Sequence, residues 1–388
     1  MNEKQKYTKW VACWGNAPSI SDRELVTYAK DLTLRYPVRI CFNGNKLRFH
    51  FSNITGQEAI KISAATVGMA IDDRSVDAST IKDITFGGSK SVVVEPGGQV
   101  ISDEVNMELS RGDNVSVTIY LGEYTRMDSG VLITGPLSKG FFAYGDYSHE
   151  SELPLNSTRS TNWFYFLDTI DIYTEDKNHA LICYGDSITA QDWPDYLMLR
   201  TYEDGYDSVS VIRRAISGTR ILREYDCITY AAYGAKGEKR FNRETDVAGA
   251  EAVIIQHGIN DIIHPVGEEV NIFRPMSDLP TCQDMIDGVT DIYVKCARNK
   301  GLKVYSGTLL PIKGWRTYAA FRDELRHAFN EWLRTSDIFD GCIDFDEAVR
   351  DKSDVDSFGP GFDSGDHLHP SAAAYKAMAG AIPKNILE

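Results

Sequence analysis

Residues 180–187 have the sequence Ala-Leu-Ile-Cys-Tyr-Gly-Asp-Ser, in which an apolar run ends abruptly at Gly185-Asp186-Ser187. Continuous apolar residues are typical of a buried strand in a parallel sheet. Open α/β sheets hold their ligands at the carboxyl ends of such strands, and a glycine permits a sharp turn there. Ser187 is therefore placed where a serine can act as a nucleophile. We expect Trp193-Pro194 to begin a helix whose dipole points back at this serine.

The chain beyond Asn178 alternates strand candidates with helical stretches. This βαβ order predicts a doubly wound parallel sheet covered by helices. Two amphipathic helices are expected to cover it, with the apolar faces Met285-Val289-Tyr293-Cys296 and Phe321-Leu325-Phe329-Trp332. The strand candidates are residues 180–184, 208–215, 252–256, 303–310 and 342–345.

Residues 38–124 follow a different pattern, in which short alternating strands are separated by turn residues such as Asn43-Gly44-Asn45. This pattern favours an antiparallel β-sandwich or jelly roll. The length of 388 residues also exceeds what one hydrophobic core usually serves. We therefore predict a β-sandwich accessory domain over residues 1–155, a linker with a returning strand over 156–178, and an α/β domain over 179–388.

The composition is that of a soluble globular protein, with 43% hydrophobic and 25% charged residues. A net charge of -15 argues against nucleic acid or an anionic membrane as a partner. The seven cysteines are scattered and form no Cys-x-x-Cys pair, which disfavours a zinc site and a disulfide framework. No apolar segment typical of an export signal follows Met1, so we expect a cytoplasmic protein of undetermined oligomeric state.

Four short motifs occur in chain order in the C-terminal half, and each of the first three follows a strand candidate. In a doubly wound sheet these strand ends meet along one edge, so Ser187, Gly218 and Asn260 are expected to converge. Ester cleavage needs a serine, a base that takes its proton, a carboxylate that orients the base, and donors for the oxyanion. The motifs are Gly185-Asp186-Ser187, Ile216-Ser217-Gly218, Gly258-Ile259-Asn260 and Asp366-His367-Leu368-His369.

These blocks resemble those of the SGNH, or GDSL-type, serine hydrolase family. The N-terminal half also resembles the β-rich domain that precedes the hydrolase domain in some members. The resemblance implies that Ser187 is the nucleophile, His369 the general base and acid, and Asp366 the residue that orients it. It also implies an oxyanion hole made of the backbone amides of Ser187 and Gly218 and the side-chain amide of Asn260. Such a mechanism needs no metal or cofactor.

The choice of His369 as the base depends on position, because Asp-x-x-His occurs four times in the chain. Asp261 and His264 follow the third strand and are a real competitor. We favour Asp366 and His369 because the family places its pair after the last strand, and because Pro370 opens a predicted helix that would hold this loop. The other two pairs are Asp146-His149, in the β half or linker, and Asp176-His179, before the first strand.

Four further side chains are candidates for lining the substrate site: Trp193, His264, Trp315 and Tyr318. Aromatic residues in such loops also commonly pack in the core, so a purely structural role stays open for each. No long amphipathic lid is present, which favours short acyl groups such as acetyl. Together with the resemblance, this predicts a serine esterase for a small ester substrate, above all an acetylated oligosaccharide. The alternatives are a lysophospholipase or short-chain lipase of the same family, and a carbohydrate-binding protein without turnover.

Overall fold

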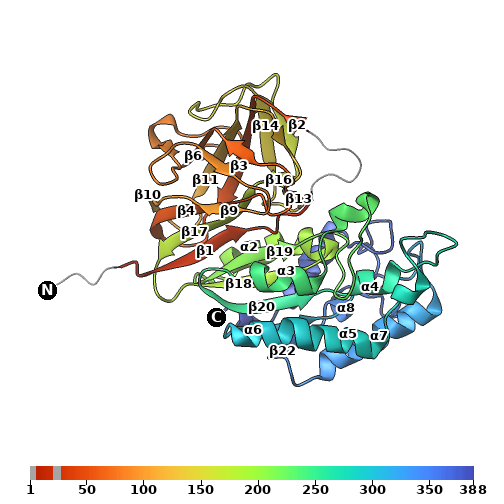
Figure 1. Cartoon of the computed structure of the whole chain (residues 1–388). Helices are drawn as coiled ribbons and strands as arrows, with labels where there is room; N and C mark the ends of the chain where they lie inside the picture. Colours follow the sequence, from red (N-terminus) through yellow and green to blue (C-terminus); the bar gives the residue numbers. More distant parts are fainter. Residues whose placement is uncertain (1–5, 21–27) are drawn as a thin grey trace. The chain divides into compact units, whose positions relative to one another are not determined.

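The computed structural model describes residues 6–20 and 28–388, which form two compact units (Figure 1). The first runs to Ala180 and also contains Asp207–Ile212, and the second comprises Leu181–Tyr206 and Arg213–Glu388. The segment expected to return to the β domain belongs to the first unit. Asp207–Ile212 also belongs there, since the Ser210 hydroxyl donates to the Ala12 carbonyl at 2.6 Å.

The N-terminal unit is built from antiparallel sheets, as its strand pattern predicts. One sheet has the order β1-β17-β4-β10 with β9 also on β4, and another has the order β15-β14-β3-β11-β6-β7. Smaller pairs are β12-β2, β13-β16 and β5-β8, and Ala78–Thr80 forms the short helix η1. The strands are β1 Lys9–Gly15, β2 Tyr28–Ala29, β3 Leu32–Arg39, β4 Gly44–Ser52, β5 Ile60–Ile62, β6 Ala64–Met69, β7 Lys82–Asp83, β8 Val92–Val94, β9 Gln99–Ile101, β10 Val105–Leu109, β11 Asn114–Leu121, β12 Thr125–Arg126, β13 Gly130–Leu132, β14 Gly140–Tyr144, β15 Arg159–Thr161, β16 Trp163–Tyr165 and β17 Leu167–Thr174.

Side chains that alternate along the strands form the core of this unit. Leu47, Phe49 and Phe51 of β4 are fully buried at every second position. The ring of Tyr36 stacks on that of Phe164 with centroids 4.6 Å apart. The returning strand β17 pairs with both β1 and β4, so the chain completes this sheet before it enters the second unit.

A five-stranded parallel sheet with the order β19-β18-β20-β21-β22 forms the centre of the α/β fold, and only the first residues of β18 and part of β19 are assigned to the N-terminal unit. In chain order this is the 2-1-3-4-5 arrangement of flavodoxin-like folds, which confirms the predicted fold class. Strand order reverses between β18 and β20, and the carboxyl ends of these two strands form the crevice where such folds bind ligands. The strands are β18 His179–Gly185, β19 Val209–Ala215, β20 Ala250–Gln256, β21 Lys303–Gly307 and β22 Gly341–Ile343.

Helices connect these strands, and one of them departs from the predicted periodicity. A π-helical turn, Val289–Val294, interrupts the stretch from Cys282 to Asn299, so Ala297 becomes buried in place of the expected Cys296. None of the helices in the described ranges has the length and apolar character needed to cross a membrane. The helices are α1 Ser187–Ala190, α2 Trp193–Glu203, α3 Gly237–Glu244, α4 Ile259–Ile263, α5 Cys282–Gly288, α6 Lys295–Asn299, α7 Ala320–Thr335, α8 Phe345–Val349 and α9 Ala372–Ala381, with short turns η2 Ile228–Tyr233, η3 Met276–Asp278, η4 Val289–Val294 and η5 Lys384–Ile386.

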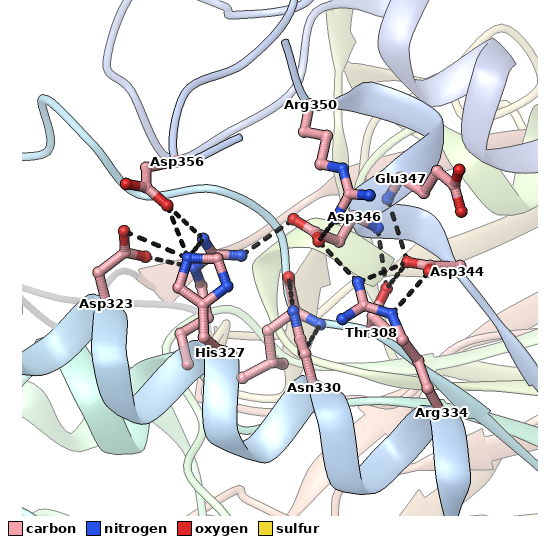
Figure 2. A network of polar contacts seen from close by, with 12 residues as sticks. Thr308, Asp323, His327, Asn330, Arg334, Asp344, Asp346, Glu347, Arg350 and Asp356 are labelled. Carbon is pink, nitrogen blue, oxygen red and sulfur yellow. Dashed lines mark hydrogen bonds and ion pairs between the residues drawn. The ribbon is translucent and has the colours of Figure 1, made fainter. Parts of the chain in front are cut away.

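The predicted apolar face of α7 is wrong in part, because the helix buries polar side chains (Figure 2). Phe321 is 46% exposed, whereas Arg326 and Asn330 are fully buried. The Asn330 amide exchanges two hydrogen bonds with the backbone of Leu309, and Arg326 donates to Asp346 at 2.9 Å. Buried polar groups are tolerated when they are paired in this way. The paired polar residues therefore set the rotation of α7.

Candidate active site

Ser187 lies in a tight turn directly after β18. A Cβ on Gly185 would lie 2.4 Å from the Gln256 carbonyl oxygen, so only glycine fits at this close approach. Asp186 caps the short helix α1 by accepting a hydrogen bond from the Ile188 amide. Ser187 itself opens α1, and the predicted helix at Trp193 follows as the separate helix α2. The serine therefore stands at the reversal point of the sheet.

Ser187, His369 and Asp366 form one hydrogen-bonded chain. The Ser187 Oγ atom lies 2.9 Å from His369 Nε2, and His369 Nδ1 lies 2.7 Å from Asp366 Oδ2. A charged carboxylate only accepts hydrogen bonds, so Nδ1 carries the proton and Nε2 accepts from the serine hydroxyl. The structure thus brings together three residues that are far apart in the sequence, in the geometry that a nucleophile, its base and an orienting acid require.

The loop that carries Asp366 keeps this carboxylate charged. The backbone amides of Leu368 and His369 donate to Asp366 Oδ1 at 3.0 and 2.8 Å. Burial acts to raise the pKa of Asp366, but the hydrogen bonds from the His369 ring and from these amides hold the pKa below its ordinary value. The acid is therefore ionised at neutral pH and fixes the tautomer of the histidine.

Gly218 and Asn260 lie on the two strand ends beside the serine. Gly218 follows β19 with φ +84°, and a Cβ there would lie 2.1 Å from the Tyr233 ring, so glycine is required on both counts. Asn260 is buried on α4 and donates from Nδ2 to the Thr219 carbonyl at 3.1 Å. An amide nitrogen carries two hydrogens, so this bond orients the group and leaves the other N–H for a ligand.

The competing pair Asp261 and His264 is not joined in the structure. Both Asp261 oxygens accept backbone amides, from Ile221 at 2.8 Å and Leu222 at 3.0 Å. His264 Nδ1 instead lies 3.0 Å from the Tyr225 hydroxyl. Burial lowers the pKa of His264 well below its ordinary value, so its ring is neutral. This pair lacks the geometry of a catalytic dyad.

The candidate substrate-lining residues have different surroundings. Trp193 is fully buried, donates its indole N–H to Thr189 at 3.3 Å and packs against Phe345, so the prediction that it lines the site is wrong. Trp315 is half-buried, with its ring perpendicular to that of His369 and 6.5 Å away. Tyr318 lies in the same turn, where its amide donates to the Trp315 carbonyl, and its contact with substrate stays a prediction.

An aromatic cluster of Tyr225, Tyr230, Tyr233 and His264 lies beside Gly218. Only His264 was a candidate on the basis of the sequence. Tyr233 stacks between Tyr230 and His264, with centroids 5.6 and 5.2 Å away. Tyr225 contacts all three rings. Three tyrosines within nine residues after the second motif were the available signal. The cluster therefore forms an aromatic surface next to Gly218, the predicted oxyanion donor.

Asp186, next to the serine, is a buried acid with an unusual pKa. Burial raises its pKa to about 7, and the neighbouring Asp261 carboxylate acts in the same direction. The pKa of Asp261 is likewise raised by burial, to about 6, although the amides of Ile221 and Leu222 oppose the shift. Burial therefore raises the pKa values of two neighbouring carboxyl groups towards neutral pH.

One group of side chains away from the serine has the composition of a metal site. Asp323, His327 and Asp356 present ligand atoms within 4.8 Å of one another (Figure 2). However, His327 Nε2 lies 2.6 Å from Asp356, and the buried Arg326 donates from Nε to Asp323 at 2.6 Å. These acceptors are already satisfied by neighbouring side chains. We therefore assign the group a structural role in holding the Asp356 loop to α7.

The model of the GDSL-like Lipase/Acylhydrolase family matches residues 183–377, half of the chain. A search of curated proteins finds no match.

Solved structures similar to the chain include a putative acylhydrolase from Bacteroides fragilis, with 19% identity, 53% of this chain and 86% of that chain covered, and a TM-score of 0.38. Another is a GDSL-like lipase from Bacteroides thetaiotaomicron, with 18% identity, 53% and 87% covered, and a TM-score of 0.36. A third is an acetylxylan esterase from Geobacillus stearothermophilus, with 15% identity, 54% and 94% covered, and a TM-score of 0.39. By the extent of the family match, the chain belongs to the GDSL-like lipase/acylhydrolase family and is a hydrolase.

Proposed function

We propose that this hydrolase is a serine esterase that cleaves short acyl esters, above all acetyl esters of a carbohydrate, through an acyl-enzyme. The observation that carries the proposal is the continuous chain from Ser187 Oγ through His369 to Asp366, with contacts of 2.9 and 2.7 Å. A serine hydroxyl needs such a base to become nucleophilic near neutral pH. The charged Asp366 stabilises the imidazolium that forms when His369 takes the proton.

The proposed reaction has two steps, which are acylation of Ser187 and hydrolysis of the acyl-enzyme. His369 Nε2 removes the proton of Ser187 while Oγ bonds to the acyl carbon, and the carbonyl oxygen becomes an oxyanion. When the ester C–O bond breaks, His369 gives this proton to the leaving alcohol. Water then attacks the acyl-enzyme with the same histidine as base, and the acid leaves while Ser187 regains its proton.

Three donors are assigned to the oxyanion. Ser187 opens α1, so its backbone N–H lacks an intrahelical acceptor. Gly218 contributes its amide from the β19 loop, and Asn260 contributes the side-chain N–H that Thr219 does not take. Donors of this kind are effective because they are fixed before the charge develops.

Two features support a small acyl group on an oxygen-rich alcohol. The Tyr233 ring lies directly against Gly218 and narrows the space beside the oxyanion. Trp315 presents its ring beside His369, and its buried indole N–H has no hydrogen-bond partner within residues 6–20 and 28–388. Since buried donors are normally paired, this N–H suits an oxygen of the substrate, and an aromatic face with a polar edge suits a sugar.

A second candidate is a lipase-like or lysophospholipase activity, and one observation favours it. The loop after α4 exposes several apolar side chains, with Val270 and Ile272 each 71% exposed and Phe273 and Met276 also exposed. Contiguous exposed apolar residues commonly mark a binding surface. An acyl chain or apolar alcohol could occupy it.

The experiment compares aryl esters from acetate to octanoate, acetylated oligosaccharides and lysophospholipids, with wild type and Ser187→Ala. We expect the highest kcat/KM on acetate and a loss of roughly 10⁴-fold or more in Ser187→Ala. Preference for octanoate or lysophospholipid would favour the second candidate. Equal rates for wild type and Ser187→Ala would reject the serine mechanism, and equally slow rates near the uncatalysed background would favour a carbohydrate-binding protein without turnover.

A further inference from the structure

We propose that Arg240, on α3 and outside all four motifs, is a positioning residue that fixes the oxyanion loop against the nucleophile turn. The proposal rests on the proposed function, because it concerns how Gly218 and Asn260 are held. It assigns no contact with substrate to Arg240.

One nitrogen of Arg240 bridges two of the motif loops. Arg240 Nη2 donates to the Gly185 carbonyl at 2.7 Å and to the Thr219 hydroxyl at 3.1 Å. Gly185 lies two residues before the nucleophile, and Thr219 follows Gly218 directly. The guanidinium therefore sets the separation between the serine turn and the loop that carries an oxyanion donor.

Thr219 extends this brace to the third motif. Its hydroxyl donates to the Ile216 carbonyl at 2.9 Å, which closes the turn around Gly218. Its carbonyl accepts from Asn260 Nδ2 at 3.1 Å and from His257 Nε2 at 3.0 Å. A shift of Thr219 would therefore move the Gly218 amide and the Asn260 amide together.

His257 secures Thr219 from behind. A carbonyl oxygen only accepts hydrogen bonds, so His257 Nε2 must carry a hydrogen, and Nδ1 then accepts from the Tyr293 hydroxyl at 2.7 Å. Burial, and next the charge of Arg240, lowers the pKa of His257 well below its ordinary value, so the ring is neutral. The Thr219 carbonyl is therefore held by both His257 and Asn260.

Arg240 is held in place by more than these loops. It is fully buried, forms an ion pair with Glu244 and lies 4.3 Å from the Tyr184 ring centroid. A buried charge is costly unless it is paired, and Glu244 supplies that pairing. The ion pair with Glu244 uses Nη1, so charge pairing does not explain why Nη2 donates to Gly185 and Thr219. A lysine could keep the charge near Glu244 but could not reproduce the planar fork.

The test compares Arg240→Lys with Arg326→Lys, a matched control in which an equally buried arginine on α7 pairs with Asp323 and Asp346. The measurements are kcat and KM on an aryl acetate, the thermal midpoint, and the dissociation constant of phenylboronic acid, which forms a tetrahedral adduct with a serine. We expect Arg240→Lys to lower kcat about 10- to 100-fold, with KM changed less than about threefold, because misplaced oxyanion donors affect the transition state most.

The affinity for phenylboronic acid distinguishes a positioning role of Arg240 from an effect on stability alone. This affinity should fall in parallel with kcat in Arg240→Lys, whereas Arg326→Lys should lower the thermal midpoint and keep kcat and boronic acid affinity. A second pair, Thr219→Val and Thr219→Ser, tests the same brace if Arg240→Lys does not fold. We expect Thr219→Val to lose kcat and boronic acid affinity together and Thr219→Ser to keep most of both.

The proposal is overturned if Arg240→Lys or Thr219→Val keeps wild-type kcat and boronic acid affinity while Ser187→Ala is inactive. It is also overturned if both arginine variants lose kcat equally and in proportion to their thermal midpoints. If Ser187→Ala keeps the wild-type rate, the proposed function itself fails, and the assigned role of Arg240 fails with it.

Discussion

Asp366-His369 and Asp261-His264 share the Asp-x-x-His spacing, yet the structure gives them opposite surroundings. In the first pair one carboxylate oxygen takes backbone amides and the other holds the histidine ring. In the second pair both oxygens take backbone amides, and the histidine turns to a tyrosine hydroxyl. The shared spacing brings an acid and a histidine near each other, and the hydrogen bonds that the acid already accepts decide whether the two side chains bind one another.

The largest difference between the two pairs is expected when each histidine is replaced by alanine. We expect His369→Ala to lower kcat on an aryl acetate by roughly 10⁴-fold or more, because Ser187 loses its base. His264→Ala should change kcat much less, since its ring contacts Tyr225 and Tyr233 and no catalytic side chain in the part of the chain described. Steady-state kinetics of the two variants measure the difference. An inactive His264→Ala together with an active His369→Ala would show that the base belongs to the Asp261-His264 pair.

The next test changes each acid to its amide. We expect Asp366→Asn to lower kcat about 10²- to 10⁴-fold, because an amide no longer selects the tautomer with a proton on Nδ1. Asp261→Asn should instead lower the free energy of unfolding by about 1–3 kcal/mol, because its NH₂ group opposes the backbone donors of Ile221 and Leu222. Kinetics and urea unfolding of both variants separate the two effects. A large fall in kcat with unchanged stability in Asp261→Asn would contradict this division.

The placement of the family's pair after the last strand, together with the helix start at Pro370, favoured Asp366-His369, and the structure joins these two side chains but not Asp261 and His264. The rotation of α7 could not be predicted in the same way. Periodicity counts apolar residues, whereas Arg326 and Asn330 are buried through partners at Asp346 and Leu309, which lie about 20 residues away in the sequence. Pairing between distant polar groups leaves no local signal.

The same limitation explains Trp193 and Arg240. Trp193 closely follows the Ser187 motif, and this proximity made it a candidate for substrate contact, whereas Arg240 lies between the Gly218 and Asn260 motifs and is near neither in the sequence. Its indole is buried because Thr189 accepts its N–H and Phe345 packs against its ring. Arg240 carries no motif, and only the folded positions of Gly185 and Thr219 show what its side chain joins.

A third test uses pH, because the pKa values of the acids in the two pairs are shifted in opposite directions. The pKa of Asp261 is raised to about 6 and that of its neighbour Asp186 to about 7, while the pKa of Asp366 is lowered. The folded protein keeps the protons of Asp186 and Asp261 to a higher pH than the unfolded chain does. Their contribution to the free energy of unfolding therefore falls as pH rises from about 4 to about 7.

Asp366 acts with the opposite sign. Its stabilising contribution is present above the ordinary aspartate pKa and is lost as pH falls through its lowered folded value. Urea unfolding of wild type and Asp186→Asn between about pH 4 and pH 8 measures the free energy of unfolding at each pH. We expect this free energy to fall less toward neutral pH in the variant than in wild type. Asn keeps the acceptor for the Ile188 amide, so the cap is retained. Identical slopes for both proteins would contradict a raised pKa at Asp186.

The smallest effect is expected from Tyr225→Phe, which removes the hydroxyl that faces His264 Nδ1. A neutral hydrogen bond of this kind contributes about 0.5–1.5 kcal/mol to stability, so unfolding should become easier by that amount, with kcat nearly unchanged. The contrast with Asp366→Asn is a matter of charge. His264 is neutral and its partner is a neutral hydroxyl, so losing the partner costs one ordinary bond. In the proposed mechanism His369 becomes an imidazolium, which a charged partner stabilises far better than a neutral one. We therefore expect the loss of the Asp366 charge to cost much more than the loss of the Tyr225 hydroxyl.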